Sequence, residues 1–212
     1  MPKLTLYYSP GASSMATHIA LCEVGAPFEL KLIELYRQEN RKPEYLAVNP
    51  EGKVPTLLVE GSEPLTEVAA TLWYLARQYP EASLLPQYGD SEGEARVISW
   101  MSFIASSIRA GRRLGDEHWR ELFLHEHWRE VFRLADVRLG RNDWAVGRYS
   151  IADIHLFRLF WRFVDTLHPT LSDYPNLSAH YDRMMARNAV KKTRSPRKAP
   201  AATTFRTVQS AP

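Results

Sequence analysis

The sequence is poor in cysteine and has no long apolar run. Its 212 residues contain a single cysteine, Cys22, which excludes an internal disulfide and a multi-cysteine metal site. No uninterrupted apolar stretch approaches the roughly 20 residues that a membrane helix needs, and the apolar start at 1–8 has no small-residue cleavage pattern. We therefore expect a globular protein of the cytoplasm with no membrane partner.

Acidic residues are missing from the end of the chain. No Asp or Glu follows position 182, whereas eight Lys and Arg residues do. Residues 1–182 consequently carry 19 basic and 24 acidic side chains, a net charge of −5, although the whole chain stands at +3. The basic segment 195–212 is rich in proline and alanine and lacks periodicity, which predicts a disordered tail and no nucleic-acid partner.

The first 80 residues alternate between strand and helix patterns. The expected elements are strands at 4–8, 28–32, 55–59 and 64–65, and helices at about 14–24, 43–46 and 66–78. The first strands are joined by a helical crossover and the last two by a hairpin turn. This β-α-β-α-β-β-α order predicts a thioredoxin-like α/β domain at 1–80.

The second part of the chain has no convincing strand alternation. A proline-bracketed linker at 81–88 leads into an expected all-α helical-bundle C-terminal domain at 89–194. Its helices are predicted from Ser91 to about Arg109 and over about 117–140, 150–164 and 176–187.

Two of these helices begin with capping signals. Ser91 and Glu94 fit a capping box. Ser150 and Asp153 form a stronger one, because the serine can accept from the first-turn amides while the carboxylate reaches back to the serine amide.

The loop from Tyr8 to Ser14 immediately precedes a predicted helix. Free amides and the helix dipole stabilise an anion at such a place. The hydroxyls of Ser13 and Ser14 either cap this helix, which is the commoner role of serine there, or donate to a thiolate. Tyr8 is a second candidate donor, the alternative being a buried tyrosine.

Two further segments offer free backbone groups. Pro55 stands at a strand start, where proline is tolerated as the first strand residue or in a cis turn; a cis bond would expose the Val54 backbone to a peptide-like ligand. Near 66–68 a helix begins, so the Val68 amide suits a ligand carboxylate and Glu67 can accept from an amine. Lys53 is a candidate contact for ligand carboxylates.

Four segments, in order and at fitting spacing, resemble the glutathione S-transferase family, most closely its bacterial, beta-like branch. They are Tyr8 to Ser14, Asn49 to Pro55, Leu65 to Glu67 and Ser150 to Asp153, and the resemblance spans residues 3–190. It implies glutathione as co-substrate, an electrophilic second substrate, a detoxifying transferase activity, a cis Val54–Pro55 bond and a homodimer.

The resemblance also implies roles for particular residues. Ser14 matches the family's thiolate-stabilising serine, with Ser13 and Tyr8 assisting. The implied glutathione contacts are Lys53, Val54, Pro55, Glu67 and Val68.

The chain departs from the branch at three places. Ser13 replaces the loop cysteine of the branch, which removes a mixed disulfide with the protein. Val68 stands where related sequences often carry serine or glycine. Arg109 and Ala110 replace an expected His-Lys pair, so acid–base chemistry by that histidine is not carried over.

A cluster of arginines could contact the second substrate. Arg109, Arg112 and Arg113 share one helix face, which suits an acidic co-substrate or a lowered thiol pKa; a solvated face is the alternative. His118, His125 and His127 lack a metal-ligand pattern, so no metal is expected.

Two rival functions remain open from the sequence. One is a catalytically weak glutathione-binding or protein-interaction module with the same fold, motivated by Ser13, Val68 and Arg109-Ala110. The other is a scaffold that contacts acidic partners through its basic tail.

Overall fold

The computed structural model describes residues 2–107 and 117–194. The N-terminal elements are β1 (Leu4–Tyr8), α1 (Ser14–Val24), β2 (Phe28–Leu32), α2 (Pro43–Leu46), β3 (Thr56–Val59), β4 (Leu65–Thr66) and α3 (Val68–Gln78). Short 3-10 turns lie at Leu35–Arg37, Glu39–Arg41 and Pro80–Ala82. This is the predicted element order.

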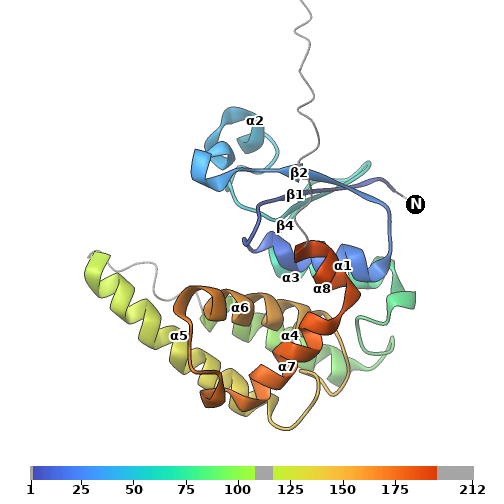
Figure 1. The fold of residues 1–212 in the computed structure, drawn as a ribbon. Helices are drawn as coiled ribbons and strands as arrows, with labels where there is room; N and C mark the ends of the chain where they lie inside the picture. Colours follow the sequence, from blue (N-terminus) through green and yellow to red (C-terminus); the bar gives the residue numbers. More distant parts are fainter. Residues whose placement is uncertain (1, 108–116, 195–212) are drawn as a thin grey trace, which may run out of the picture.

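The four strands form one mixed sheet in the order β2-β1-β3-β4. β1 runs parallel to β2 and antiparallel to β3, and β4 pairs antiparallel with β3. Leu4 and Leu6 point from β1 into the core, and α1 ends at Gly25, whose positive φ of 68° allows the chain to turn back. α1 and α3 lie between the sheet and the helical domain, with α2 on the far side of the sheet (Figure 1). The thioredoxin-like prediction is confirmed.

The described part of the C-terminal domain contains helices and no strand. It contains α4 (Ser91–Ser107), α5 (Glu117–Leu139), α6 (Ile151–Leu167), α7 (Pro175–Ala186) and α8 (Asn188–Arg194), with a 3-10 turn at Leu171–Asp173. The predicted all-α domain is confirmed, and α8 is an addition. No helix in the described ranges combines the length and the apolar character needed to cross a bilayer. The predicted disordered tail at 195–212 lies outside the described residues.

The start of α4 differs from the prediction. The Asp90 carboxylate accepts a hydrogen bond from the Gly93 N–H at 2.9 Å, so Asp90 is the cap. Glu94 points elsewhere and forms an ion pair with Arg77 of α3 at 2.5 Å. The predicted capping box of Ser91 and Glu94 is therefore wrong, because an aspartate one residue earlier fills the capping position.

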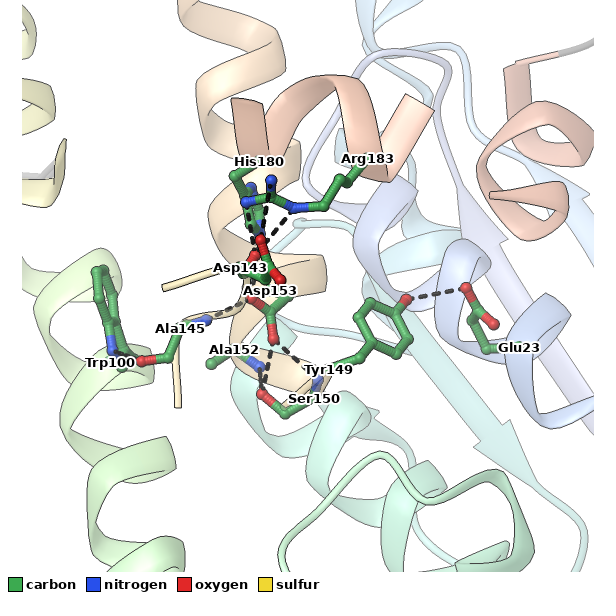
Figure 2. A network of polar contacts seen from close by, with 10 residues as sticks. All are labelled: Glu23, Trp100, Asp143, Ala145, Tyr149, Ser150, Ala152, Asp153, His180 and Arg183. Carbon is green, nitrogen blue, oxygen red and sulfur yellow. Dashed lines mark hydrogen bonds and ion pairs between the residues drawn. The ribbon is translucent and has the colours of Figure 1, made fainter. Parts of the chain in front are cut away.

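The capping box of α6 is confirmed and belongs to a larger buried network (Figure 2). The Ser150 hydroxyl accepts from the Ala152 N–H at 3.3 Å, and Asp153 Oδ2 accepts from the Ser150 N–H at 2.9 Å. Asp153 Oδ1 accepts from the Ala145 N–H at 2.7 Å and contacts His180 Nε2 at 3.0 Å. Ser150, Asp153 and His180 are fully buried, so this helix start is closed to solvent.

One hydrophobic core joins the two domains. Leu84 and Leu85, from the predicted linker 81–88, are buried in the same cluster as Leu6 of β1, Phe157 of α6 and Val190 of α8. The middle of the predicted linker is thus packed into the core. The helical domain therefore forms a fixed platform beneath α1 and α3.

A polar contact also crosses the domain boundary. The Glu23 carboxylate of α1 accepts from Arg187 Nε at 2.6 Å and from the Tyr149 hydroxyl at 2.9 Å. Burial, reinforced by the Glu23 charge, raises the pKa of Tyr149 well above 10. The phenol therefore stays protonated and remains a hydrogen-bond donor to α1.

Candidate functional site

Strand register brings the three predicted ligand segments to one edge of the sheet. β1 ends beside the beginning of β3, since Tyr7 pairs with Thr56, and β4 ends there as well, since Thr56 pairs with Thr66. The loop 8–14, the segment 53–55 and the start of α3 consequently meet at this edge.

The Ser14 side chain is turned into the protein. Its hydroxyl accepts from the Ser9 N–H at 3.1 Å, donates to the Ser9 carbonyl at 3.2 Å and has no exposed surface. This contact closes the loop on itself. The direct thiolate contact predicted for Ser14 stays a prediction, and this orientation does not favour it.

Ser13 is the half-buried residue at the N-cap position of α1, yet its side chain makes no capping hydrogen bond. The prediction that Ser13 or Ser14 caps this helix is therefore wrong, because the Ser14 hydroxyl is held by Ser9. Within residues 2–107 and 117–194, no hydrogen bond engages the N–H of either serine or the Ser13 hydroxyl. Because Ser14 has no exposed surface, the helix start presents the hydroxyl and the N–H of half-buried Ser13 to a ligand.

Tyr8 ends β1 in the same loop. Its half-buried ring lies against His18 of α1, with ring centroids 5.9 Å apart. Tyr8 is therefore brought to the edge where Ser13 lies.

Helix α6 supplies the wall that faces this loop. Arg158, a residue only 9% exposed, donates from Nε to the Ala12 carbonyl and from Nη2 to the Gly11 carbonyl, each at 3.3 Å. The Trp161 ring lies 3.7 Å from the position that a Cβ on Gly11 would take. Sequence analysis missed Arg158, although a lone arginine inside the apolar run 154–160 was a readable signal.

His155 lies one turn before Arg158 on α6. Burial, together with the positive charge of Arg158, lowers the pKa of His155 to about 3. The imidazole is consequently neutral at physiological pH.

The segment before β3 is held by buried side chains. The Val54–Pro55 bond is cis, as the resemblance implied. The Lys53 carbonyl accepts from the Tyr45 hydroxyl at 2.5 Å and from Asn49 Nδ2 at 3.0 Å. The main-chain N–H and C=O of Val54 make no hydrogen bond within the described residues, which leaves a free donor and acceptor at the sheet edge.

The start of α3 is the second open helix start at this edge. Glu67 occupies its N-cap position at φ 65°, ψ 135°, without a side-chain capping bond. Such a φ is rare outside glycine and is often found at functional sites. Glu67 Oε1 lies 3.9 Å from Lys53 Nζ, and Val68 begins the helix.

A buried contact fixes the two open starts side by side. The hydroxyls of Thr17 in α1 and Thr71 in α3 are hydrogen-bonded at 2.8 Å. The predicted residues Tyr8, Ser13, Lys53, Val54, Pro55, Glu67 and Val68 thus gather at one edge. The predicted second-substrate arginines Arg109, Arg112 and Arg113 lie outside the described residues.

Two family models match the chain. Their descriptions are "Glutathione S-transferase, N-terminal domain", over residues 12–78, and "Glutathione S-transferase, C-terminal domain", over residues 124–188.

Two curated relatives cover most of the chain. Glutathione S-transferase GstA of Escherichia coli O157:H7 is 31% identical over 196 residues, which cover 89% of this chain and 96% of the relative. Maleylacetoacetate isomerase of Pseudomonas aeruginosa is 40% identical over 167 residues, covering 73% and 77%.

Solved structures show the same fold. A glutathione transferase homologue from Sulfitobacter, with bound glutathione, is 30% identical with a TM-score of 0.80, covering 91% of this chain and 97% of that one. A bacterial beta class glutathione S-transferase of Sphingomonas chungbukensis is 34% identical with a TM-score of 0.79, covering 89% and 96%.

Proposed function

Because this chain belongs to the glutathione S-transferase family, we propose that it is an enzyme that activates the thiol of glutathione for attack on an electrophilic small molecule. The observation that carries the proposal is the open start of α1. There the hydroxyl and the N–H of Ser13 make no hydrogen bond within the described residues, next to Tyr8, at the positive end of a helix.

The proposed chemistry is stabilisation of a thiolate. Glutathione loses its thiol proton to solvent, and the sulfur accepts hydrogen bonds from the hydroxyl and the N–H of Ser13. The sulfur lone pair then forms a bond with the electrophilic carbon, and the bonding pair leaves with the leaving group or moves into the π system. Lowering the thiol pKa by two units requires about 2.7 kcal/mol.

The rest of the tripeptide is proposed to follow the sheet edge. The free N–H and C=O of Val54 pair with the peptide backbone of glutathione as an added strand would. The Val68 N–H, with Lys53 beside it, receives a ligand carboxylate, and Glu67 accepts from the ligand amine. Ser14 acts indirectly, since its hydroxyl holds the loop through hydrogen bonds to Ser9.

The direct test combines binding with turnover. Calorimetry should detect glutathione binding by the wild-type protein, and Ser13→Ala should lower kcat/KM for conjugation of a chloronitrobenzene by about 10- to 100-fold. The matched control is Ser178→Ala, a half-buried helical serine of α7, which should leave both unchanged. No detectable glutathione binding by the wild-type protein would contradict the proposal.

The same experiment addresses the alternatives. Binding without conjugation of several electrophiles would favour the non-catalytic glutathione-binding module. Since one relative bears the name of an isomerase, cis–trans isomerisation of a maleyl compound should be assayed beside conjugation. Deleting residues 195–212 should leave both activities unchanged, whereas loss of a partner on deletion would favour the scaffold.

We also propose a homodimer, following the family. The exposed apolar side chains Ile98 of α4 and Leu134 and Val137 of α5, 54%, 54% and 77% exposed, are consistent with a covered surface. Sedimentation equilibrium should give twice the mass of the chain.

A further inference from the structure

We propose that Arg158 is a positioning residue for the thiol site, which aims the free donors at the start of α1 by holding the carbonyls of Gly11 and Ala12. The inference rests on the proposed function, since it takes the glutathione sulfur to lie at this helix start. The helical domain then contributes to thiol activation by fixing the geometry of the loop.

The contact is a buried, charge-assisted one across the domain boundary. Both donor–acceptor distances are 3.3 Å, and the acceptors are consecutive carbonyls of the loop. A guanidinium fits this pair because its donors form a rigid planar fork. Holding a charge at 9% exposure is costly, so the loop geometry gained in return is a reasonable function for it.

The peptide plane between Ala12 and Ser13 links this contact to the site. In a trans peptide the C=O and the N–H point in opposite directions. Arg158 draws the Ala12 carbonyl toward α6, so the Ser13 N–H points away from α6. Rotation of this plane would therefore redirect the Ser13 N–H.

Hydrogen bonds inside the turn hold the same loop. The Ala12 N–H donates to the Ser9 carbonyl at 3.1 Å, and the Ala12 carbonyl also accepts from the Met15 N–H at 3.1 Å. Ser9 is in turn held by Ser14. The loop thus has hydrogen bonds of its own and, through Arg158, hydrogen bonds to the helical domain.

Helix α6 is a rigid support for that contact. Its start is fixed by the buried Ser150–Asp153 capping box, and its middle is buried against both domains. Arg158 lies two turns after this start, so its guanidinium is anchored on a helix that is held both at its start and along its middle. A movement of α6 would consequently change the direction of the Ser13 N–H.

The test is the pH dependence of thiol activation in two variants and a control. Arg158→Met keeps the stem and removes the donors, whereas Arg158→Lys keeps the charge without the fork. The matched control is Arg183→Met, since Arg183 also binds a main-chain carbonyl, that of Asp143 at 2.8 Å, away from the loop. Thermal unfolding of each variant checks folding, and the lysine variant preserves the test if the methionine variant does not fold.

We expect the thiol pKa of bound glutathione, followed by ultraviolet absorbance of the thiolate, to rise by about one unit in Arg158→Met. The kcat/KM for conjugation should then fall about tenfold near pH 6.5 and stay within about twofold near pH 9. Arg158→Lys should show an intermediate rise, and Arg183→Met none. A purely structural role would lower activity at all pH values equally.

Two results would overturn the inference. One is a wild-type pH profile in both Arg158 variants, and the other is a wild-type profile in Arg158→Lys together with a shifted one in Arg158→Met, which would assign the effect to charge alone. Failure of the proposed function has a different signature, since wild-type protein would then neither bind glutathione nor lower its thiol pKa.

Discussion

The helices α1 and α6 both begin with a serine at the N-cap, but their starts are built in opposite ways. At α6, Ser150 and Asp153 satisfy each other's backbone, and the site is buried beneath Ala145 and His180. At α1, Ser13 caps nothing. The same residue type thus closes one helix and leaves the other open.

The difference separates a structural helix start from a binding one. Free N–H groups at a helix start cost stability unless side chains, water or a ligand satisfy them. The chain meets that requirement internally at α6, and we infer that glutathione meets it at α1. The open starts of α1 and α3 lie side by side, tied by Thr17 and Thr71, where one ligand can reach both.

The largest expected effect comes from breaking the closed start. Asp153→Ala removes the acceptor of two backbone N–H groups and the partner of buried His180. We expect a loss of about 3 kcal/mol or more in the free energy of unfolding, measured in urea. Asp153→Asn, which keeps one acceptor oxygen, should lose less; equal losses would contradict this assignment.

Removing the hydroxyl at the open start should affect activity and not stability. Ser13→Ala is expected to lower kcat/KM by about 10- to 100-fold while the free energy of unfolding stays within about 0.5 kcal/mol. Steady-state kinetics and urea unfolding on the same preparation check both parts. A large loss of stability would mean that Ser13 is a structural cap after all.

Replacing Ser14 should affect stability more than activity. Ser14→Ala leaves the buried Ser9 N–H without its acceptor, so we expect a loss of about 2 kcal/mol in the free energy of unfolding. The loss of kcat/KM should be smaller than in Ser13→Ala. If Ser14→Ala is instead the more damaging to turnover, the hydroxyl must rotate toward the ligand, as the family resemblance implied.

The burial of His155 on α6 predicts a smaller effect, a dependence of stability on pH. The folded-state pKa of His155 is about 3, against 6.5 for the free side chain. Below about pH 6.5 the unfolded chain therefore binds a proton that the folded protein does not, and stability is lost as the pH falls toward 3. Lowering the pH from about 7.5 to 5.5 should cost the wild-type protein about 1.4 kcal/mol more than His155→Leu. Parallel stability curves would contradict a buried neutral His155.

Local patterns predicted most of the fold. The alternation of Leu4 and Leu6 marked β1, and the capping box at Ser150 placed the start of α6 to the residue. The period-2 and period-3.6 patterns succeed here because each element buries one face against the core. The helix α8 was missed because only two of its residues, Ala189 and Val190, are buried among basic ones.

The details of the site depended on contacts between distant segments. Choosing between Ser13 and Ser14 required the position of Ser9, and the role of Arg158 required the placement of α6 against the loop. Similarly, Asp90 rather than Ser91 caps α4, since neighbouring capping residues compete and sequence alone does not rank them. Sequence thus located the sheet edge, and tertiary contacts decided which side chains face it.

The most direct measurement is a structure of the chain with glutathione bound. We predict that the sulfur lies within hydrogen-bond distance of the Ser13 hydroxyl at the start of α1, with the ligand backbone paired to Val54. A sulfur held by another group, a ligand bound away from this edge, or no ligand at a saturating concentration would contradict the proposed role of the open helix start.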